Sequence, residues 1–493
     1  MARTVTRPVI AAALAWNLLA PYALAAQTPS NTPARANSAE IEELIAEKAS
    51  SCAAVDDEDV IADDGRKVAW RCRANDKWTV LLNGIPQGGT FDEVRSLIFS
   101  PDGQHMAYAA RRGNRWMIVE DAAERSATYS DVGSLLFSAD GKRIAFSAKP
   151  AKKWTLVVDG EPQPAEFDGI VYWIFSPDSR RIAYVGRRRD KFIVVVDGKE
   201  GTPSDIVGGL RFSSDSGRVA YAAADVKRGF GKQKAVGRVT IDGTAGPASE
   251  GAQVGSLLKS AVTGSTPQIY TGYVSQFWID THGVSAPVFS PDGMRVAHAV
   301  RRDKDATVIV LDGKQGPVFP SIIAGPVFSP DNRQVAFAIS ENQTKALVID
   351  EANVGRGPGG DTDFITHLTF APGNGPLAYI GVAGGTLYDE GRTARARRRV
   401  YVDGVAGPEY NVPYLGGLEF SVDGKHVAYV VGGLSEASRS VAFVVVNGHE
   451  GKRYDDVFGR PRLDGDRRTV TYTAQSGRKF YAVSASIEDT ASR

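Results

Sequence analysis

The chain has 493 residues, 43% of them apolar, with 58 basic and 57 acidic side chains and a formal net charge of +1. A chain of this length can bury several times the core of one ordinary domain. Its near-zero charge balance does not indicate a nucleic-acid-binding protein, so no nucleic-acid partner is expected.

The N-terminus has the pattern of an export signal. Arg3 and Arg7 precede an apolar run over residues 9–20, and alanines at 23 and 25 suit cleavage after residue 25. The run is too short for a comfortable membrane span, and no later segment approaches the length needed. We therefore expect a signal peptide at residues 1–25, no transmembrane segment after its removal, and a periplasmic or secreted protein.

Two short segments follow the signal. Residues 26–38 are mostly polar and contain two prolines, which predicts a disordered linker. Residues 39–51 have Ser38 as an N-cap and Ile41, Leu44 and Ile45 at helical spacing. This pattern predicts one short helix that docks on the rest of the chain.

The sequence contains two cysteines, Cys52 and Cys72. In an oxidising compartment such a pair predicts a disulfide, which would close a loop of about 20 residues and contribute on the order of 3 kcal/mol. Two buried free thiols are the alternative. Two cysteines this far apart lack the ligand cluster of a zinc site, so neither a metal nor another cofactor is expected.

Residues 52–493 form an internal repeat. "FSPDGQHMAYAARRGNRWMIVED", "FSADGKRIAFSAKPAKKWTLVVDGE" and "FSPDSRRIAYVGRRRDKFIVVVDGK" follow one another at intervals of 38 residues. The leading aromatic residue recurs at Phe99, Phe137, Phe175, Phe212, Phe289, Phe328, Phe370 and Phe420. With weaker copies near residues 61 and 464, the sequence contains about ten copies.

Each copy alternates apolar and polar residues with period two, as strands do, and Asp-Gly turns separate its segments. Four antiparallel strands per repeat predict an all-β fold, a β-propeller of about ten blades. One large ring and two rings both remain open. The 77-residue step between Phe212 and Phe289 marks residues 243–287 as an insertion or a ring join. The last copy lacks a fourth strand, which the segment near Cys52 could supply.

The phrase "FSPDG" with "AY" a few residues later, followed by "VVDG", resembles the exported TolB-like and WD-repeat-like propeller families over residues 55–485. This resemblance implies the propeller fold and carries little information about function, because the motif residues build turns. The aspartates of "SPDG" are accordingly interpreted as turn residues rather than ligands.

A search for catalytic motifs finds none. The sequence has no G-x-S-x-G, no H-E-x-x-H and no P-loop. A carboxylate pair for glycoside hydrolysis remains open, but almost every aspartate falls on a repeat turn. No catalytic residue is therefore predicted.

Basic residues recur in the connection between the second and third strands of the repeats. We call this set the basic rim; it comprises Arg111, Arg112, Arg115, Lys152, Lys153, Arg187, Arg188, Arg189, Arg301, Arg302, Arg397, Arg398 and Arg399. Brought to one face by a ring, these residues could bind an anionic partner; alternatively, they are solvated hairpin tips. The aromatic residues that start the third strand, such as Trp116 and Trp154, are expected to pack between blades rather than to stack on a ligand.

These patterns favour an exported, non-enzymatic scaffold that binds a protein or an anionic cell-envelope polymer through its face loops. The alternative is a glycan-active hydrolase or lyase with its site in the central channel. Carboxylates clustered at the channel would favour the enzyme, and small side chains there would favour the scaffold.

Overall fold

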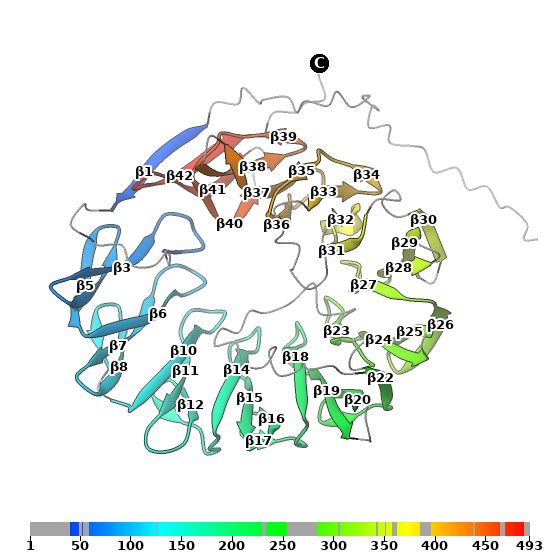
Figure 1. Ribbon diagram of the computed structural model, residues 1–493, viewed down its shortest axis with the longest axis horizontal. Coiled ribbons are helices and arrows are strands. Elements are labelled where there is room, and N and C mark those ends of the chain that lie inside the picture. The colour runs from blue at the N-terminus through cyan, green and yellow to red at the C-terminus, as the bar shows by residue number, and fades with distance from the viewer. Residues whose placement is uncertain are drawn as a thin grey trace, which may run out of the picture.

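The computed structural model of the protein describes residues 40–48, 52, 59–125, 127–228, 233–253, 283–303, 306–341, 344–350, 352–356, 362–384, 396–436, 439–463 and 469–487. The predicted signal peptide and linker lie outside the described residues. The described part is a single ring of ten antiparallel sheets, the predicted all-β propeller (Figure 1). The two-ring alternative is excluded.

The first five blades follow one another in chain order, and each runs from an inner strand (A) to an outer strand (D). Their strands are β2 (Val60–Ile61), β3 (Val68–Ala74), β4 (Lys77–Leu82) and β5 (Ile85–Phe91); β6 (Glu93–Phe99), β7 (Met106–Arg112), β8 (Arg115–Glu120) and β9 (Ala123–Glu124); β10 (Asp131–Phe137), β11 (Ile144–Lys149), β12 (Thr155–Val158) and β13 (Glu161–Pro162); β14 (Gly169–Phe175), β15 (Ile182–Arg188), β16 (Lys191–Val196) and β17 (Lys199–Glu200); β18 (Ile206–Phe212), β19 (Val219–Arg228), β20 (Gln233–Ile241) and β21 (Thr244–Ala245), with β22 (Ser249–Gln253) added.

Blades six to ten continue around the ring in the same way, with a 3-10 turn at Pro372–Asn374. Their strands are β23 (Val288–Phe289), β24 (Val296–Asp303), β25 (Ala306–Leu311) and β26 (Lys314–Phe319); β27 (Ile322–Phe328), β28 (Val335–Glu341), β29 (Thr344–Ile349) and β30 (Ala352–Arg356); β31 (Phe364–Phe370), β32 (Leu377–Ala383), β33 (Arg397–Val402), β34 (Val405–Ala406) and β35 (Tyr410–Asn411); β36 (Tyr414–Phe420), β37 (Val427–Glu436), β38 (Arg439–Val446) and β39 (His449–Glu450); and β40 (Asp456–Leu463), β41 (Thr469–Ser476), β42 (Lys479–Ser486) and β1 (Ile41–Glu47).

The predicted short helix at 39–51 is wrong, because residues 41–47 form the strand β1. It pairs antiparallel with β42 and supplies the outer strand that the last repeat lacks, so the two ends of the described chain close one blade (Figure 1). The apolar residues at helical spacing do not form a buried face: Ile41 and Leu44 are exposed, and Ala46 is the buried residue of β1. The open edge of β42 takes up the segment as a strand because edge strands present unpaired backbone groups.

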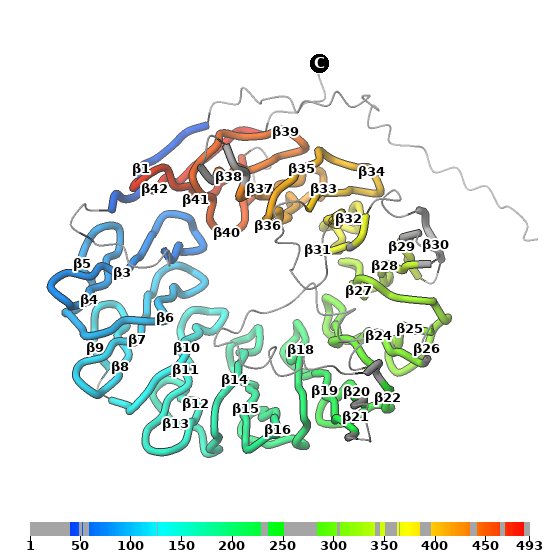
Figure 2. The backbone as a smooth tube through the Cα atoms, viewed as in Figure 1, coloured from blue at the N-terminus to red at the C-terminus, as the bar shows by residue number. Residues whose placement is uncertain are grey.

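Each hydrophobic core lies between two blades rather than at the centre of the ring. Trp116 and Ile118 of blade two pack against Phe137 and Phe146 of blade three, and similar clusters join the other neighbours. Ala46 and Phe480 of blade ten pack with Trp70 of blade one, so the cluster closes the ring. The inner strands, such as β10, lie nearer the centre than the outer strands, such as β13 (Figure 2).

Residues 243–287 contain no further blade among those described. β22 extends blade five by pairing with β20, and β23 then starts blade six. Blades five and six are direct neighbours, since the Ser214 hydroxyl and the Arg218 guanidinium donate hydrogen bonds to the carbonyls of Pro291 and Met294. Residues 254–282 of this predicted insertion lie outside the described residues.

Candidate functional site

The turns between strands A and B use their aspartates to hold the backbone. In blade three the Ser138 hydroxyl donates to Asp140, and the backbone N–H of Lys142 donates to the same carboxylate oxygen at 3.2 Å. These hydrogen bonds hold the pKa of Asp140 below its ordinary value. Blades four, five, six and seven repeat the serine–aspartate contact at Asp178, Asp215, Asp292 and Asp331. The structure therefore supports the interpretation of these residues as turn residues.

An arginine links these turns to the next blade. The Arg143 Nε donates to Asp159 of its own C–D turn at 2.8 Å, and its Nη1 donates to the carbonyls of Ser179 and Arg180 in blade four. Its guanidinium lies 5.3 Å from the ring centroid of Phe175. We call the residues with this arrangement the clamp arginines; they are Arg143, Arg181, Arg218 and Arg295.

The clamp arginines were missed by the sequence analysis. Each lies five residues after the turn serine, so aligning the repeats on that serine would have found the position. Its contact with the neighbouring blade needs the ring geometry. On this face, the aspartates of the turns and the clamp arginines thus bond mainly to one another and to the backbone. The A–B and C–D turns therefore stabilise the ring.

The opposite face, where strands B and C join, carries the basic rim, and many of its residues are paired. Arg112 forms two hydrogen bonds to Glu124, and Arg188 forms two to Glu200. Lys153 pairs with Asp168 and, with the N–H of Arg189, lowers the pKa of that carboxyl. Further ion pairs of the rim join Arg111 to Glu93, Arg397 to Glu409, and Arg399 to Glu409.

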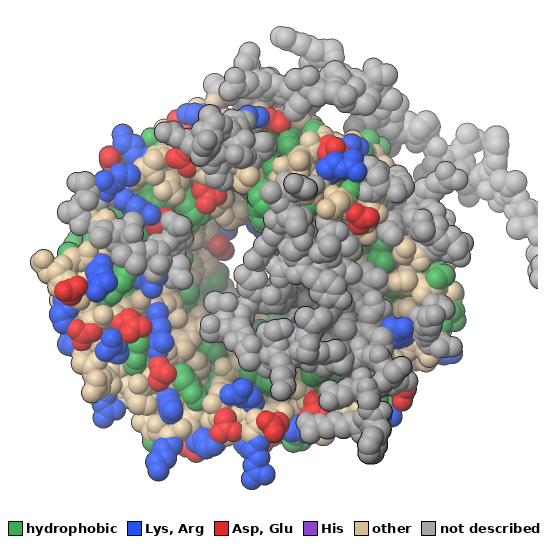
Figure 3. All heavy atoms as spheres, viewed as in Figure 1, with side chains coloured by type: hydrophobic (Ala, Val, Ile, Leu, Met, Phe, Trp, Pro, Cys, Tyr) green, Lys and Arg blue, Asp and Glu red, His purple; other side chains and the backbone are tan. Residues whose placement is uncertain are grey.

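The other rim residues divide into buried and exposed side chains. Arg398 is 3% exposed and donates to backbone carbonyls of Ala396 and Val412, so it does not belong to the surface. Arg301 is half-buried. The exposed rim residues that form no ion pair with any described carboxylate are Arg115, Lys152, Arg187, Arg189 and Arg302. Figure 3 shows Lys and Arg side chains beside Asp and Glu side chains around the ring.

The aromatic residues at the start of strand C pack between blades, as expected. Trp116 is buried in the core between blades two and three, and Phe192 in the core between blades four and five. The Arg95 guanidinium lies 3.8 Å from the Trp116 ring centroid and also pairs with Asp131 of the next blade. These rings therefore stabilise the blade contacts and are not presented to a ligand.

The inner strands that border the open centre of the ring are irregular at one position. Most strand A–B pairs shift register around the residue three before the leading phenylalanine, a β-bulge that releases that residue from the ladder. At this position blades two to nine have Ser96, Ser134, Tyr172, Gly209, Ala286, Gly325, His367 and Gly417. In blade four Tyr172 stays paired with Val185, and Val171 is the bulged residue. Six of the eight side chains are small, and none is a carboxylate.

One carboxyl group of the inner strands has an unusual environment. Burial raises the pKa of Glu419 in β36, and Arg460 and Arg462 of β40 oppose the rise. Arg460 also lies close enough to His367 to add to the lowering of its pKa, which burial causes in the main. The described inner strands thus bring one carboxyl group toward two arginines, rather than two carboxyl groups toward each other.

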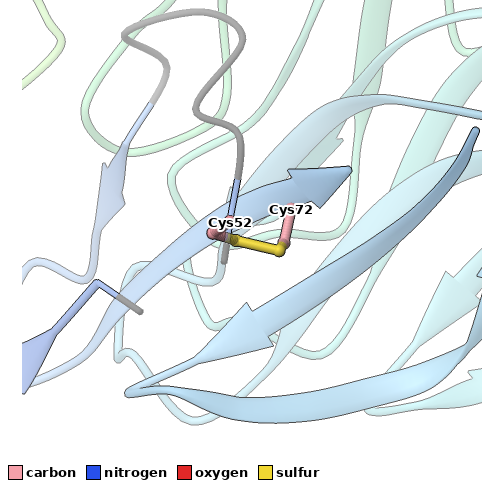
Figure 4. Close-up of a disulfide and its surroundings, with 2 residues drawn as sticks. All are labelled: Cys52 and Cys72. Carbon is pink, nitrogen blue, oxygen red and sulfur yellow. A yellow bond between two sulfur atoms is a disulfide. The ribbon is translucent and has the colours of Figure 1, made fainter. Parts of the chain in front are cut away.

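The two cysteines lie side by side where the chain enters blade one. Cys52 and Cys72 of β3 are joined, and their Cα atoms are 5.3 Å apart (Figure 4). The bond ties the segment after β1 to the first complete blade. The absence of free thiols in the purified protein stays a prediction.

The comparisons with known proteins find similarity to solved structures at low sequence identity. No protein-family model and no curated protein matches the chain. A eukaryotic initiation factor is 11% identical over 80% of this chain and 97% of its own, with a TM-score of 0.42. An oligogalacturonate lyase in complex with manganese is 14% identical over 81% and 99%, with a TM-score of 0.33. TolB from Acinetobacter baumannii is 15% identical over 57% and 63%, with a TM-score of 0.23.

Similarities at this level carry no argument about function. The ten-bladed fold rests on the sheet order described above, and the resemblance of the repeats to the TolB-like family stays a prediction. Among the described residues, no helix is long and apolar enough to cross a membrane.

Proposed function

We propose that this protein is an exported, non-enzymatic scaffold that binds a protein or an anionic polymer of the cell envelope through one face of the ring. The observation that carries the proposal is the set of exposed cations at the B–C ends of blades two, three and four. Arg115, Lys152, Arg187 and Arg189 lie on these consecutive blades and form no ion pair with any described carboxylate. Consecutive blades place their charges along one arc.

The remaining rim residues have a different part in the proposal. Arg112, Arg188 and Lys153 are held by carboxylates, so their charges are largely compensated. Arg115, Lys152 and Arg189 form no ion pair with a described carboxylate, and Arg187 interacts with Asp168 only through its charge. Fixed charges of one sign on a rigid surface add up to a local potential that the net charge of +1 conceals.

The test compares two double variants on a dextran-sulfate resin over a salt series. Arg187→Ser with Arg189→Ser removes two charges from the proposed arc. The variant should elute at clearly lower salt than the unaltered protein, because less salt is needed to screen the charges that still hold it on the resin; this screening acts beyond about 8 Å at physiological ionic strength. Unfolding by urea should change little, since exposed charges contribute little stability.

The matched control is Lys142→Ser with Arg180→Ser. It removes the same charge from exposed A–B turns of blades three and four, on the opposite face. This control should elute with the unaltered protein. Equal elution of both double variants, whether shifted or unshifted, contradicts binding through the proposed arc.

A further inference from the structure

Blade two differs from blades three to six at two positions on the turn face, the face that carries the A–B and C–D turns. The clamp position holds His105, where blades three to six have arginine. The last residue of strand C holds Glu120, where every other blade from one to nine has an apolar side chain: Leu82, Val158, Val196, Ile241, Leu311, Ile349, Val402 and Val446. Both departures fall beside the C–D turn residue Asp121.

The pairing of β7 with β8 inside blade two brings these three side chains together. The His105 Nδ1 lies 2.7 Å from the Asp121 Oδ2, and each of the three residues places one nitrogen or carboxylate oxygen within 4.8 Å of the others. The side chains of His105 and Asp121 are about half exposed, at 43% and 48%, and that of Glu120 is 18% exposed. The cluster is therefore open to solvent on one side.

Part of the cluster is fixed by the fold. The Asp121 Oδ1 accepts the backbone N–H of Met106 at 3.0 Å, which leaves Oδ2 directed at His105. Strand pairing places Glu120 opposite both Ala107 and Ala123. Glu120 pairs with Arg125, whose side chain is 57% exposed and can move away when another cation approaches. A cleft of about 220 Å³ between blades one and two, lined in part by His105 and Asp121, gives access.

The cluster does not replace the clamp. Arg143 in blade three contacts both its own turn aspartate and the next blade, whereas His105 contacts its own turn aspartate and makes no hydrogen bond to a described residue of blade three. Glu120 takes the place of an apolar residue that packs against the next blade, as Val158 does in the core of blades three and four. Glu120 therefore gives up this packing contact for an ion pair with an exposed arginine, which a metal ion bound by all three side chains would replace.

We propose that His105, Glu120 and Asp121 form a binding site for a divalent transition-metal ion such as Zn²⁺. One imidazole nitrogen and two carboxylate oxygens are ligands of the kind that zinc accepts, and water would complete the coordination. The site lies on the turn face, away from the basic rim, and does not depend on the proposed function. The sequence analysis expected no metal because it considered the spacing of the cysteines and not the fold of blade two.

The test is calorimetric titration of the full, tag-free chain with zinc chloride. The unaltered protein should bind one zinc ion at this site. His105→Ala and Glu120→Val should each weaken this binding about tenfold or more, since even the loss of a residue that only orients a ligand has an effect of that size. Glu120→Val restores the residue type of the other blades, so its urea midpoint should equal or exceed that of the unaltered protein.

The chain offers a matched control in blade nine. His426 occupies the same position as His105, but its Nδ1 contacts the amide nitrogen of Asn447 at 2.8 Å, and Val446 stands where blade two has Glu120. His426→Ala should therefore leave zinc binding unchanged. The proposal is overturned if the unaltered protein binds no zinc, if His105→Ala and Glu120→Val bind it as tightly as before, or if His426→Ala weakens binding equally.

Discussion

At the scale of single residues, one buried position of strand B shows how the repeats differ. The third residue of this strand in blades one to nine, and the fourth in blade ten, is buried in every blade and is aromatic in nine: Trp70, Tyr108, Phe146, Tyr184, Tyr221, Phe337, Tyr379, Tyr429 and Tyr472. Blade six has His298 there, 9% exposed, and its Nδ1 has no hydrogen-bond partner among the described residues. Burial lowers the pKa of His298 from 6.5 to about 4.

His298 should make stability depend on mildly acidic pH. Its pKa is lower in the folded protein than in the unfolded chain, so the unfolded chain binds more protons between pH 6.5 and pH 4 and stability falls as pH falls through this window. His298→Phe, the residue type of the other blades, should remove a loss on the order of 3 kcal/mol between these limits. Urea midpoints measured from pH 7 to pH 4 test this.

The control for this prediction is His426→Ala, which alters a partly exposed histidine. Its urea midpoints should follow those of the unaltered protein across the whole window. A His298→Phe variant that loses stability on acidification as steeply as the unaltered protein would show that this histidine is not buried in its neutral form.

At the scale of the blade, the strands could be predicted from local signals and the contacts between blades could not. Asp-Gly turns and alternating apolar residues are properties of neighbouring residues, so they predicted four strands per repeat and the Asp140-type turns. Arg143 and Arg181 bond to carbonyls 36 and 35 residues further along the chain, and Arg218 bonds to one 76 residues further, so nothing local marks such a partner. The paired state of Arg112 and Arg188 was also not visible, because their carboxylates come from a different strand of the same blade.

The clamp predicts that two adjacent arginines of blade four, Arg180 and Arg181, contribute unequally to the free energy of unfolding. Arg181 bonds to Asp197, to the carbonyls of Ser216 and Gly217, and lies 5.1 Å from the Phe212 ring centroid. Arg181→Ala should lower the free energy of unfolding by about 1–2 kcal/mol, because a charged donor to several acceptors is lost at a half-exposed position. The measurement is the urea midpoint.

Arg180→Ala is the matched control, since Arg180 is exposed and forms no side-chain hydrogen bond or ion pair with a described residue. Its urea midpoint should stay with that of the unaltered protein. If the two variants unfold at the same urea concentration, the clamp contributes nothing to the contact between blades four and five.

At the scale of the whole molecule, the ring depends on how its ends meet. A missing outer strand in the last repeat predicted that an N-terminal segment would complete the ring, and this closure is confirmed. The segment is β1 rather than the residues around Cys52, and the prediction of a helix there was wrong. Apolar residues spaced three and four apart indicate a helix only when they form one buried face. The pairing of β1 with β42 depends on the closed ring, so the local sequence could not show it.

The closing strand is anchored by polar contacts along its first half. Glu40 accepts the backbone N–H of Lys452 at 2.7 Å, and Glu42 accepts hydrogen bonds from the side chains of Lys452 and Tyr454. Burial alone would raise the pKa of Glu42, but these two hydrogen bonds outweigh it and lower the pKa. The second half is anchored by Ala46, which packs in the cluster that joins blades ten and one.

Ring closure predicts that one small side chain of β1 matters to the stability of the molecule. Ala46 is 6% exposed in the cluster with Trp70 and Phe480, so Ala46→Asn would place an amide where there is neither room nor a partner. The variant should lose about 2–4 kcal/mol of unfolding free energy, from overpacking and an unsatisfied polar group together. Ile41→Asn changes the same strand at a side chain that is 71% exposed and should cost little. Urea unfolding followed by intrinsic fluorescence measures both.

Because a ring that opens at one seam exposes two blades, Ala46→Asn should also make the N-terminal segment accessible to proteolysis at urea concentrations that leave Ile41→Asn intact. Equal midpoints and equal cleavage for the two variants would mean that β1 does not close the ring in solution.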